Sequence, residues 1–150
     1  MSRKKHFNPY AYCDGLDKGV PFATLSDRQA ESPTFQKMSD GAKYVLMVCR
    51  LCRQYHTGTD KNGRSRSIQG NGLYFYFNRA IQKKYGLNNP NRVRAELIEL
   101  VQGGFLDVIE CNGHARKKNV YAFCSKWREA DRGEQITLSA AARTFIQGRP

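Results

Sequence analysis

The middle of the chain carries the start and stop signals of two helices joined by a very short connection. Asn78 can cap the first helix, and Gly86 can end it. Asn89 and Pro90 restart a helix, because asparagine favours the N-cap and proline the first helical position. The dipeptide Gly103-Gly104 ends this second helix. A helix, a tight turn and a second helix are therefore predicted over residues 78–102.

Apolar periodicity predicts the elements on either side of this pair. A helix is predicted over residues 39–55, with Ser39 as its N-cap. Its apolar face recurs at spacings of three and four: Ala42, Val45, Leu46, Cys49 and Cys52. The aromatic run 73–77 predicts a short strand with half of its rings in the core. Residues 105–111 and 119–124 predict two strands around a basic loop.

The order of these elements resembles that of winged helix-turn-helix DNA-binding domains. The resemblance covers roughly residues 36–127 and is carried by three runs: NRAIQKKYGL at 78–87, NPNRVRAELIEL at 89–100 and GGFLDV at 103–108. The last run is similar to the Gly-Phe-Leu entry to the wing in that superfamily. The resemblance implies an α+β fold, namely a winged helix-turn-helix with a three-helix core, a small antiparallel β-sheet and a wing hairpin.

This resemblance also implies how the chain is divided. Residues 38–127 form the expected winged-helix domain. Residues 1–37 are expected to be an irregular N-terminal arm, tied to the core by Phe22, Leu25 and Phe35. Residues 128–150 are expected to be a C-terminal tail, with one short helix near 138–145 that would be the place for a homodimer contact. The Gly-rich segment 56–72 is expected to be a long loop.

The charge of the chain indicates a polyanionic partner. The sequence has 25 Lys and Arg against 13 Asp and Glu, a net charge of +12 that is spread along the chain. Such a charge costs self-repulsion in the folded state, and nucleic acid is the simplest partner to compensate for it. Double-stranded DNA is the partner that the winged-helix resemblance implies, bound without a cofactor or a metal ion.

The position of each polar residue in the predicted fold suggests its role on DNA. The start of the second helix of the pair would read the major groove. Asparagine suits adenine edges there, and arginine suits guanine edges or phosphates. The predicted wing tip would bind the DNA backbone. The basic residues of the long loop would make a second backbone contact, unless this loop is a mobile insertion without a function. Further candidates lie in the first helix of the pair. The candidate DNA-binding residues are Asn88, Asn91, Arg92, Arg94, Arg116, Lys117, Lys118, Arg64, Arg66, Arg79 and Lys83.

The lead into the first helix carries a second resemblance. The run ESPTFQKMSDGA at 31–42 resembles the entry to the N-terminal winged-helix modules of plasmid and phage replication initiators. This resemblance implies a mobile-element protein with a role in replication initiation or transcription control. Those initiators commonly carry a second domain, for which 150 residues leave no room, so transcription control stays open.

The remaining motifs argue against an enzyme. There is no phosphate-binding P-loop motif, and the three histidines are scattered. Cys49 and Cys52 form a C-x-x-C, but Cys111 and Cys124 would lie on the order of 16 Å apart in the predicted hairpin. A shared zinc site is therefore not expected, and the thiols read as buried free cysteines of a cytoplasmic protein. No apolar run is long enough to predict a membrane span.

Two alternatives to DNA binding stay open. The same basic surface could bind RNA or a ribonucleoprotein, in which case structured RNA would be preferred over duplex DNA. Some winged helices are protein-interaction domains, in which case nucleic acid would not bind at physiological salt.

Overall fold

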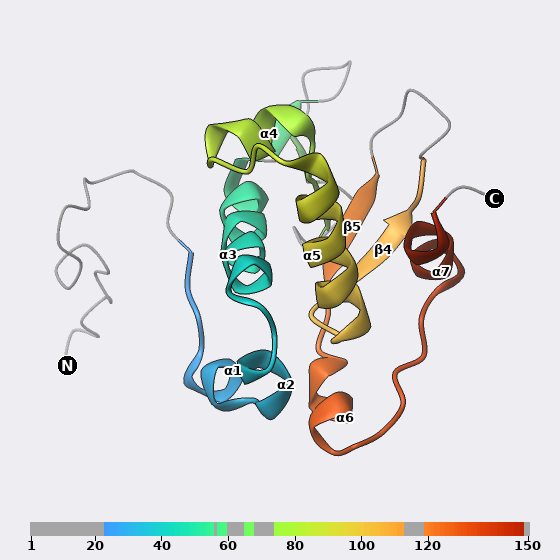
Figure 1. The fold of residues 1–150 in the computed structure, drawn as a ribbon. Helices are drawn as coiled ribbons and strands as arrows, with labels where there is room; N and C mark the ends of the chain where they lie inside the picture. Colours follow the sequence, from blue (N-terminus) through green and yellow to red (C-terminus); the bar gives the residue numbers. More distant parts are fainter. Residues whose placement is uncertain (1–22, 56, 60–64, 68–73, 113–118, 149–150) are drawn as a thin grey trace, which may run out of the picture.

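The computed structural model describes residues 23–55, 57–59, 65–67, 74–112 and 119–148 (Figure 1). These residues form an α+β fold of helices and short antiparallel strands. The helices are α1 (Asp27–Glu31), α2 (Pro33–Gln36), α3 (Asp40–Tyr55), α4 (Arg79–Lys84), α5 (Pro90–Gln102), α6 (Trp127–Asp131) and α7 (Ala140–Gln147). The strands are β1 (Thr57–Thr59), β2 (Ser65–Ser67), β3 (Tyr74–Tyr76), β4 (Leu106–Glu110) and β5 (Val120–Phe123).

The main sheet is three-stranded and antiparallel, in the order β3-β5-β4. Strand β3, which precedes the helix pair, aligns Phe75 with Tyr121 of the last strand. Strands β4 and β5 are consecutive and align Val108 with the same Tyr121. The pairing of β4 with β5 confirms the predicted hairpin around residues 112–118. Along the chain, the helix pair α4–α5 lies between β3 and β4.

The predicted helix boundaries of the pair are confirmed. The side chains of Asn78 and Asn89 accept hydrogen bonds from the backbone N–H groups of Ile81 (3.0 Å) and Arg92 (3.2 Å). Gly86 and Gly104 lie just beyond the helix ends with φ of 79° and 82°, which glycine adopts without steric cost. The chain therefore turns sharply after each helix, because each of these glycines follows the C-cap residue.

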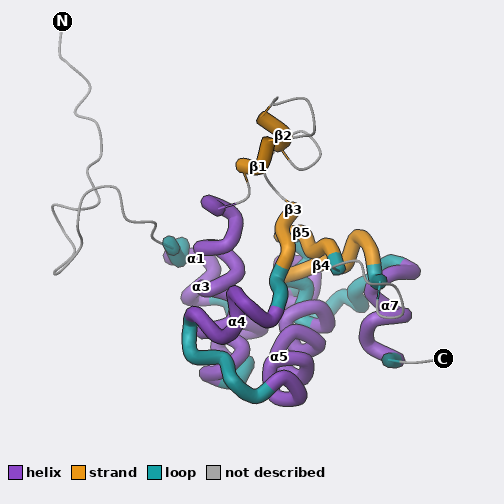
Figure 2. Tube along the Cα trace, turned by 90° about the horizontal axis from the view of Figure 1, so that it is seen from above, coloured by secondary structure: helices purple, strands orange, loops and turns teal. Residues whose placement is uncertain are grey.

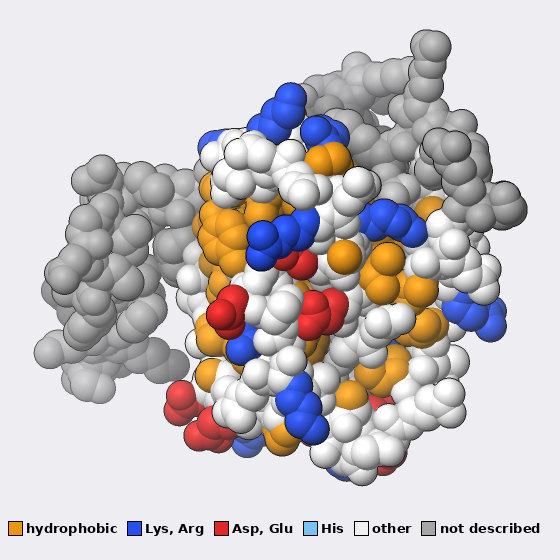
Figure 3. All heavy atoms as spheres, in the orientation of Figure 1, with side chains coloured by type: hydrophobic (Ala, Val, Ile, Leu, Met, Phe, Trp, Pro, Cys, Tyr) orange, Lys and Arg blue, Asp and Glu red, His pale blue; other side chains and the backbone are white. Residues whose placement is uncertain are grey.

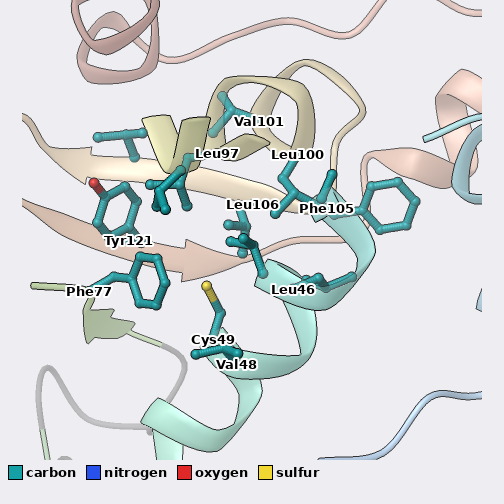
Figure 4. Close-up of a cluster of buried hydrophobic side chains, with 14 of the residues drawn as sticks. Leu46, Val48, Cys49, Phe77, Leu97, Leu100, Val101, Phe105, Leu106 and Tyr121 are labelled. Atoms are coloured by element: carbon teal, nitrogen blue, oxygen red, sulfur yellow. The ribbon is translucent and has the colours of Figure 1, made fainter. Parts of the chain in front are cut away.

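The core lies between α3, α5 and the sheet (Figure 4). Side chains from all three parts meet there, among them Leu46, Cys49, Leu97, Leu100, Leu106 and Tyr121. Phe75 is fully buried and Phe77 is 5% exposed, and Phe75 stacks on Phe123 with ring centroids 4.7 Å apart. Phe75 and Phe77 of the aromatic run therefore lie in the core, in agreement with the prediction that half of its rings do.

The prediction of an irregular arm over residues 1–37 is wrong for residues 27–36. Ser26 and Ser32 cap two short helices, α1 and α2, by accepting from Gln29 N and Phe35 N. Phe35 is buried in the core, as predicted. Its ring packs edge-on against that of Phe105. Leu25 is 41% exposed and does not anchor the segment. Phe22 lies outside the described residues.

The segment 56–72 was also predicted as a loop, and this is wrong in part. Strands β1 and β2 pair in a separate two-stranded sheet, with Gly58 opposite Arg66. Figure 2 shows this hairpin standing apart from the three-stranded sheet, beyond one end of α3. Residues 60–64, which join the two strands in the chain, lie outside the described residues.

The C-terminal segment packs on the core. The expected short helix is confirmed as α7, whose Ala142 and Phe145 are buried. Ser139 caps this helix and donates from Oγ to Asp107 Oδ1 (3.0 Å) and Val108 O (3.1 Å) of β4. The shorter helix α6 was not predicted; its Trp127 stacks on Phe105 with ring centroids 5.9 Å apart.

Asp131 at the end of α6 ties α2 to the rest of the fold. Its Oδ1 accepts from Ser32 Oγ (2.8 Å), Thr34 N (3.0 Å) and Thr34 Oγ1 (2.6 Å). Desolvation acts to raise the pKa of this carboxyl, but the hydrogen bonds from Thr34 and Ser32 outweigh it and hold the pKa below its ordinary value. The ionised form is therefore the one that stabilises the fold.

We expect Asp131→Ala to lower the free energy of unfolding by about 1–2 kcal/mol at neutral pH, since charge-assisted hydrogen bonds are lost. Because the folded pKa is depressed, the stabilisation is present above the unfolded pKa of about 3.9. It is lost as the pH falls through the folded pKa. Urea unfolding should show a larger difference from wild type at pH 7 than at pH 3. Glu31→Ala, at an exposed carboxylate, is the control, and an equal effect there would contradict this role for Asp131.

Candidate nucleic-acid interface

Helix α4 lies across the N-terminal end of α5 (Figure 1), and both helices carry basic or amide residues there. On the face drawn in Figure 3, Lys and Arg atoms gather in the upper part, over α4 and the start of α5. Acidic atoms on that face lie mostly lower, toward the opposite end of α5. Five of the predicted DNA-binding residues are exposed at this end: Arg79, Lys83, Asn88, Asn91 and Arg92.

Arg92 is held in place by a buried carboxylate. Its Nε donates to Glu96 Oε1 at 3.1 Å, and the side chains of Arg92 and Glu96 are 74% and 9% exposed. Glu96 in turn fits against Gly41 of α3, where an added Cβ would lie 2.0 Å from Oε1. The ion pair uses Nε, so it leaves the two terminal nitrogens of this largely exposed side chain for other contacts. Their fork geometry suits a phosphate or a guanine edge.

Arg94 was predicted to contact DNA, but its side chain lies against α7. It is half-buried, donates from Nη2 to Phe145 O at 2.6 Å, and has its guanidinium carbon 5.0 Å from the centre of the Phe145 ring. These contacts join α5 to α7. No local pattern predicts these contacts, because the docking position of α7 is a tertiary feature.

Glu99, farther along α5, is engaged with α3. Its carboxylate accepts from Ser39 N (2.7 Å) and Ser39 Oγ (2.7 Å), while Ser39 Oγ accepts from Ala42 N (3.2 Å) as the predicted N-cap. The negative charges of α5 are thus used inside the fold, at Glu96 and Glu99. The exposed first turn of α5 carries asparagine and arginine instead.

Several predicted site residues cannot be placed in this cluster. Arg64 and the wing residues 116–118 lie outside the described residues. Arg66 lies in β2, and only its backbone is described. At the end of the β4–β5 hairpin, Asn112 N donates to Asn119 Oδ1 at 2.6 Å, which joins the two strands just before the loop.

Two hollows flank the first turn of α5. One, of about 350 Å³, lies between α3 and the α4–α5 turn and is lined by Tyr44, Asn88 and Arg92, among others. The other, of about 320 Å³, lies between α4, α5, β5 and α7 and is lined by Arg79, Arg94 and others. Sequence analysis missed both, because each is formed by elements distant in the chain.

Gln82 is a buried polar side chain that lines the second hollow. It is 8% exposed, and its Nε2 donates to Phe77 O at 3.3 Å. Its Oε1 is buried and has no hydrogen-bond partner among the described residues. A glutamine between Ile81 and Lys83 reads in the sequence as an ordinary polar helix residue, so no pattern singled it out.

The thiols of α3 are inert. Burial raises the pKa of the Cys49 thiol well above its ordinary value and raises that of Cys52 to about 12. Both are therefore protonated and buried in the core, as predicted. Among the residues that the structure describes, no group of three or more His, Cys, Asp or Glu side chains is placed to hold a metal ion.

Comparison of the chain with protein-family models, with curated proteins and with solved structures gave no match. In the described part of the chain, none of the helices has both the length and the apolar character needed to cross a membrane.

Proposed function

We propose that this chain is a winged helix-turn-helix protein that binds double-stranded DNA. The order of α3, β3, α4, α5, β4 and β5 and the sheet order β3-β5-β4 support this fold. The observation that carries the function is the exposed start of α5, where Asn91 and Arg92 of the first turn and Asn88 of the preceding connection stand beside a basic α4.

In this mode of binding, the first turn of α5 enters the major groove. The fork of Arg92 reads a guanine edge or a phosphate, and Asn91 reads an adenine edge. Arg79 and Lys83 of α4 neutralise phosphates on one side, and the wing residues Arg116, Lys117 and Lys118 neutralise those on the other. Arg94 serves the docking of α7 rather than base recognition.

The biological role follows from the resemblance of residues 31–42 to plasmid and phage replication initiators. We infer a cytoplasmic, non-enzymatic role in replication initiation or in transcription control of a mobile element. The run that carries this resemblance forms α2 and the capped start of α3. A homodimer formed through the C-terminal helix belongs to the same proposal.

Fluorescence anisotropy with a labelled duplex, a single strand and a hairpin RNA, from roughly 50 to 300 mM salt, tests the proposal. We expect the duplex to bind best, with log affinity falling against log salt by about 0.9 for each phosphate contacted. Preference for the hairpin would replace DNA by RNA as the partner. Absence of binding at the lowest salt would reject nucleic-acid binding and leave a protein partner.

A further inference from the structure

Arg92 occupies a position that the stability of its own helix does not explain. It lies in the first turn of α5, where the helix dipole disfavours a positive charge. It precedes Glu96 by four residues, and a basic residue before an acidic one stabilises a helix less than the reverse order does. An ion pair with one largely exposed partner also adds little to folding. The stability of α5 therefore does not account for this pair.

The acidic partner of Arg92 is restrained by the fold. Glu96 is buried, and its carboxyl group fills the space beside Gly41 of α3, where an added Cβ would lie 2.7 Å from Glu96 Cδ. A buried carboxylate without a partner is costly. Among the described residues that line the adjoining hollow, Arg92 is the only one with a positive charge. Glu96 therefore restrains the guanidinium of Arg92 through its Nε.

This restraint suits a base edge better than it suits a phosphate. Binding of a phosphate depends on positive charge, and the carboxylate beside Arg92 offsets that charge. Binding of guanine requires that two nitrogens of the planar guanidinium meet the neutral acceptors O6 and N7 together. A group that is oriented before binding loses less conformational entropy on contact. The Arg92–Glu96 pair therefore favours guanine as the group that Arg92 reads.

We propose that Glu96 is a positioning residue that makes Arg92 specific for guanine, and that Gly41 provides the space for its carboxylate. This inference rests on the proposed binding of duplex DNA, and it decides between the two contacts that were left open there for Arg92. Glu96 acts through Arg92 and not by its own contact with DNA. Removal of Arg92 should accordingly change the salt dependence of binding less than removal of Arg79 or Lys83 does.

A duplex that wild type selects from a randomised pool provides the probe. Each guanine of this duplex is replaced in turn by 7-deazaguanine, which lacks the N7 acceptor, and binding is measured by fluorescence anisotropy. We expect one replacement to weaken binding by wild type about tenfold. Arg92→Lys keeps the charge but loses the fork, so it should be indifferent to that replacement and keep the salt slope of wild type. The comparison identifies the guanine that Arg92 reads.

Glu96→Ala tests the positioning role. It should reduce the tenfold effect to about twofold, because the guanidinium is no longer oriented before binding. It should not weaken binding to a duplex of A·T pairs alone, since the substitution removes a negative charge near the phosphates. Glu96→Gln keeps an acceptor for Arg92 Nε and should retain most of the preference. Glu99→Ala is the matched control, because this carboxylate of the same helix bonds Ser39 instead, and it should discriminate as wild type does.

Gly41→Ala makes the same test without removing a charge. Its methyl group would take the place of the Glu96 carboxyl group, which is the far end of a flexible side chain and can move. Alanine favours a helix more than glycine does, so α3 should still form, which circular dichroism checks. This variant should lose the guanine preference as Glu96→Ala does, and it decides the question if Glu96→Ala does not fold.

The inference is overturned if none of the replacements weakens binding by wild type, or if Glu96→Ala and Gly41→Ala discriminate as wild type does. Equal losses of affinity for the selected duplex and the A·T duplex would also overturn it, because they indicate a purely structural role. In these cases wild type still binds duplex DNA, and the proposed function stands. Absence of duplex binding by wild type would reject the proposed function and this inference together.

Discussion

Replacing Gly104 with alanine is expected to lower the free energy of unfolding by roughly 2–4 kcal/mol. Gly104 ends α5 with φ of 82°, a left-handed conformation that costs an L-residue about 1–2 kcal/mol. An added Cβ would also lie 2.5 Å from Trp127 N and 2.6 Å from the carbonyl carbon of Lys126. These are backbone atoms, so the contact cannot be relieved by turning a side chain. Urea unfolding monitored by circular dichroism gives the difference directly.

Gly86→Ala is the matched control for this prediction. Gly86 ends α4 with φ of 79°, and nothing lies within 4 Å of the position where a Cβ would be added. This variant should carry only the conformational cost of about 1–2 kcal/mol. Equal destabilisation by the two substitutions would show that the close contact of the added Cβ at Gly104 with Lys126 and Trp127 adds no cost to that of the backbone conformation.

Replacing Arg79, Lys83 and Arg92 together with alanine is expected to weaken duplex binding by about a hundredfold or more near 0.1 M salt. Each phosphate contact contributes about 0.9 to the slope of log affinity against log salt, which is worth roughly tenfold at that salt. The slope should accordingly fall by about 2.7 if all three side chains contact phosphates. Anisotropy titrations of one duplex at several salt concentrations measure both quantities.

A control variant must remove the same charge elsewhere. Arg28→Ala, Lys37→Ala and Arg132→Ala together remove three positive charges from exposed residues near α1, α2 and α6, at the opposite end of the fold. This variant should keep most of the affinity and the salt slope of wild type. Equal losses in the two triple variants would show that net charge, rather than the α4–α5 surface, determines binding.

The sequence predicted those parts of the fold that are determined by local chemistry. Asn78 and Asn89 cap helices because their side chains reach backbone N–H groups a few residues away, and the glycines after those helices supply the φ that turns the chain. The helices α1 and α2 were missed because their residues bury little surface of their own. They are held by Phe35 in the core and by the bonds to Asp131, which lies almost a hundred positions later.

The candidate site was predictable only where position along α5 decides exposure. Asn91 and Arg92 are exposed as expected, since they lie outside the apolar stripe of the helix. Arg94 has the same chemistry and was assigned the same role, but α7 covers it, and nothing in the local pattern shows where α7 docks. Gln82 was missed for the converse reason, because tertiary packing buried a residue that looked exposed.

Some residues of α5 are engaged in the fold and others are exposed. This difference determines where the proposed DNA-binding specificity can change. Val93, Leu97 and Leu100 belong to the core. Glu96 packs against Gly41 of α3, and Glu99 accepts hydrogen bonds from Ser39 at the start of α3. Positions 91 and 95 are exposed. In the proposed DNA-binding mode, new target preferences are therefore expected to arise at those two positions with little loss of stability, and a library randomised there should yield mostly folded proteins.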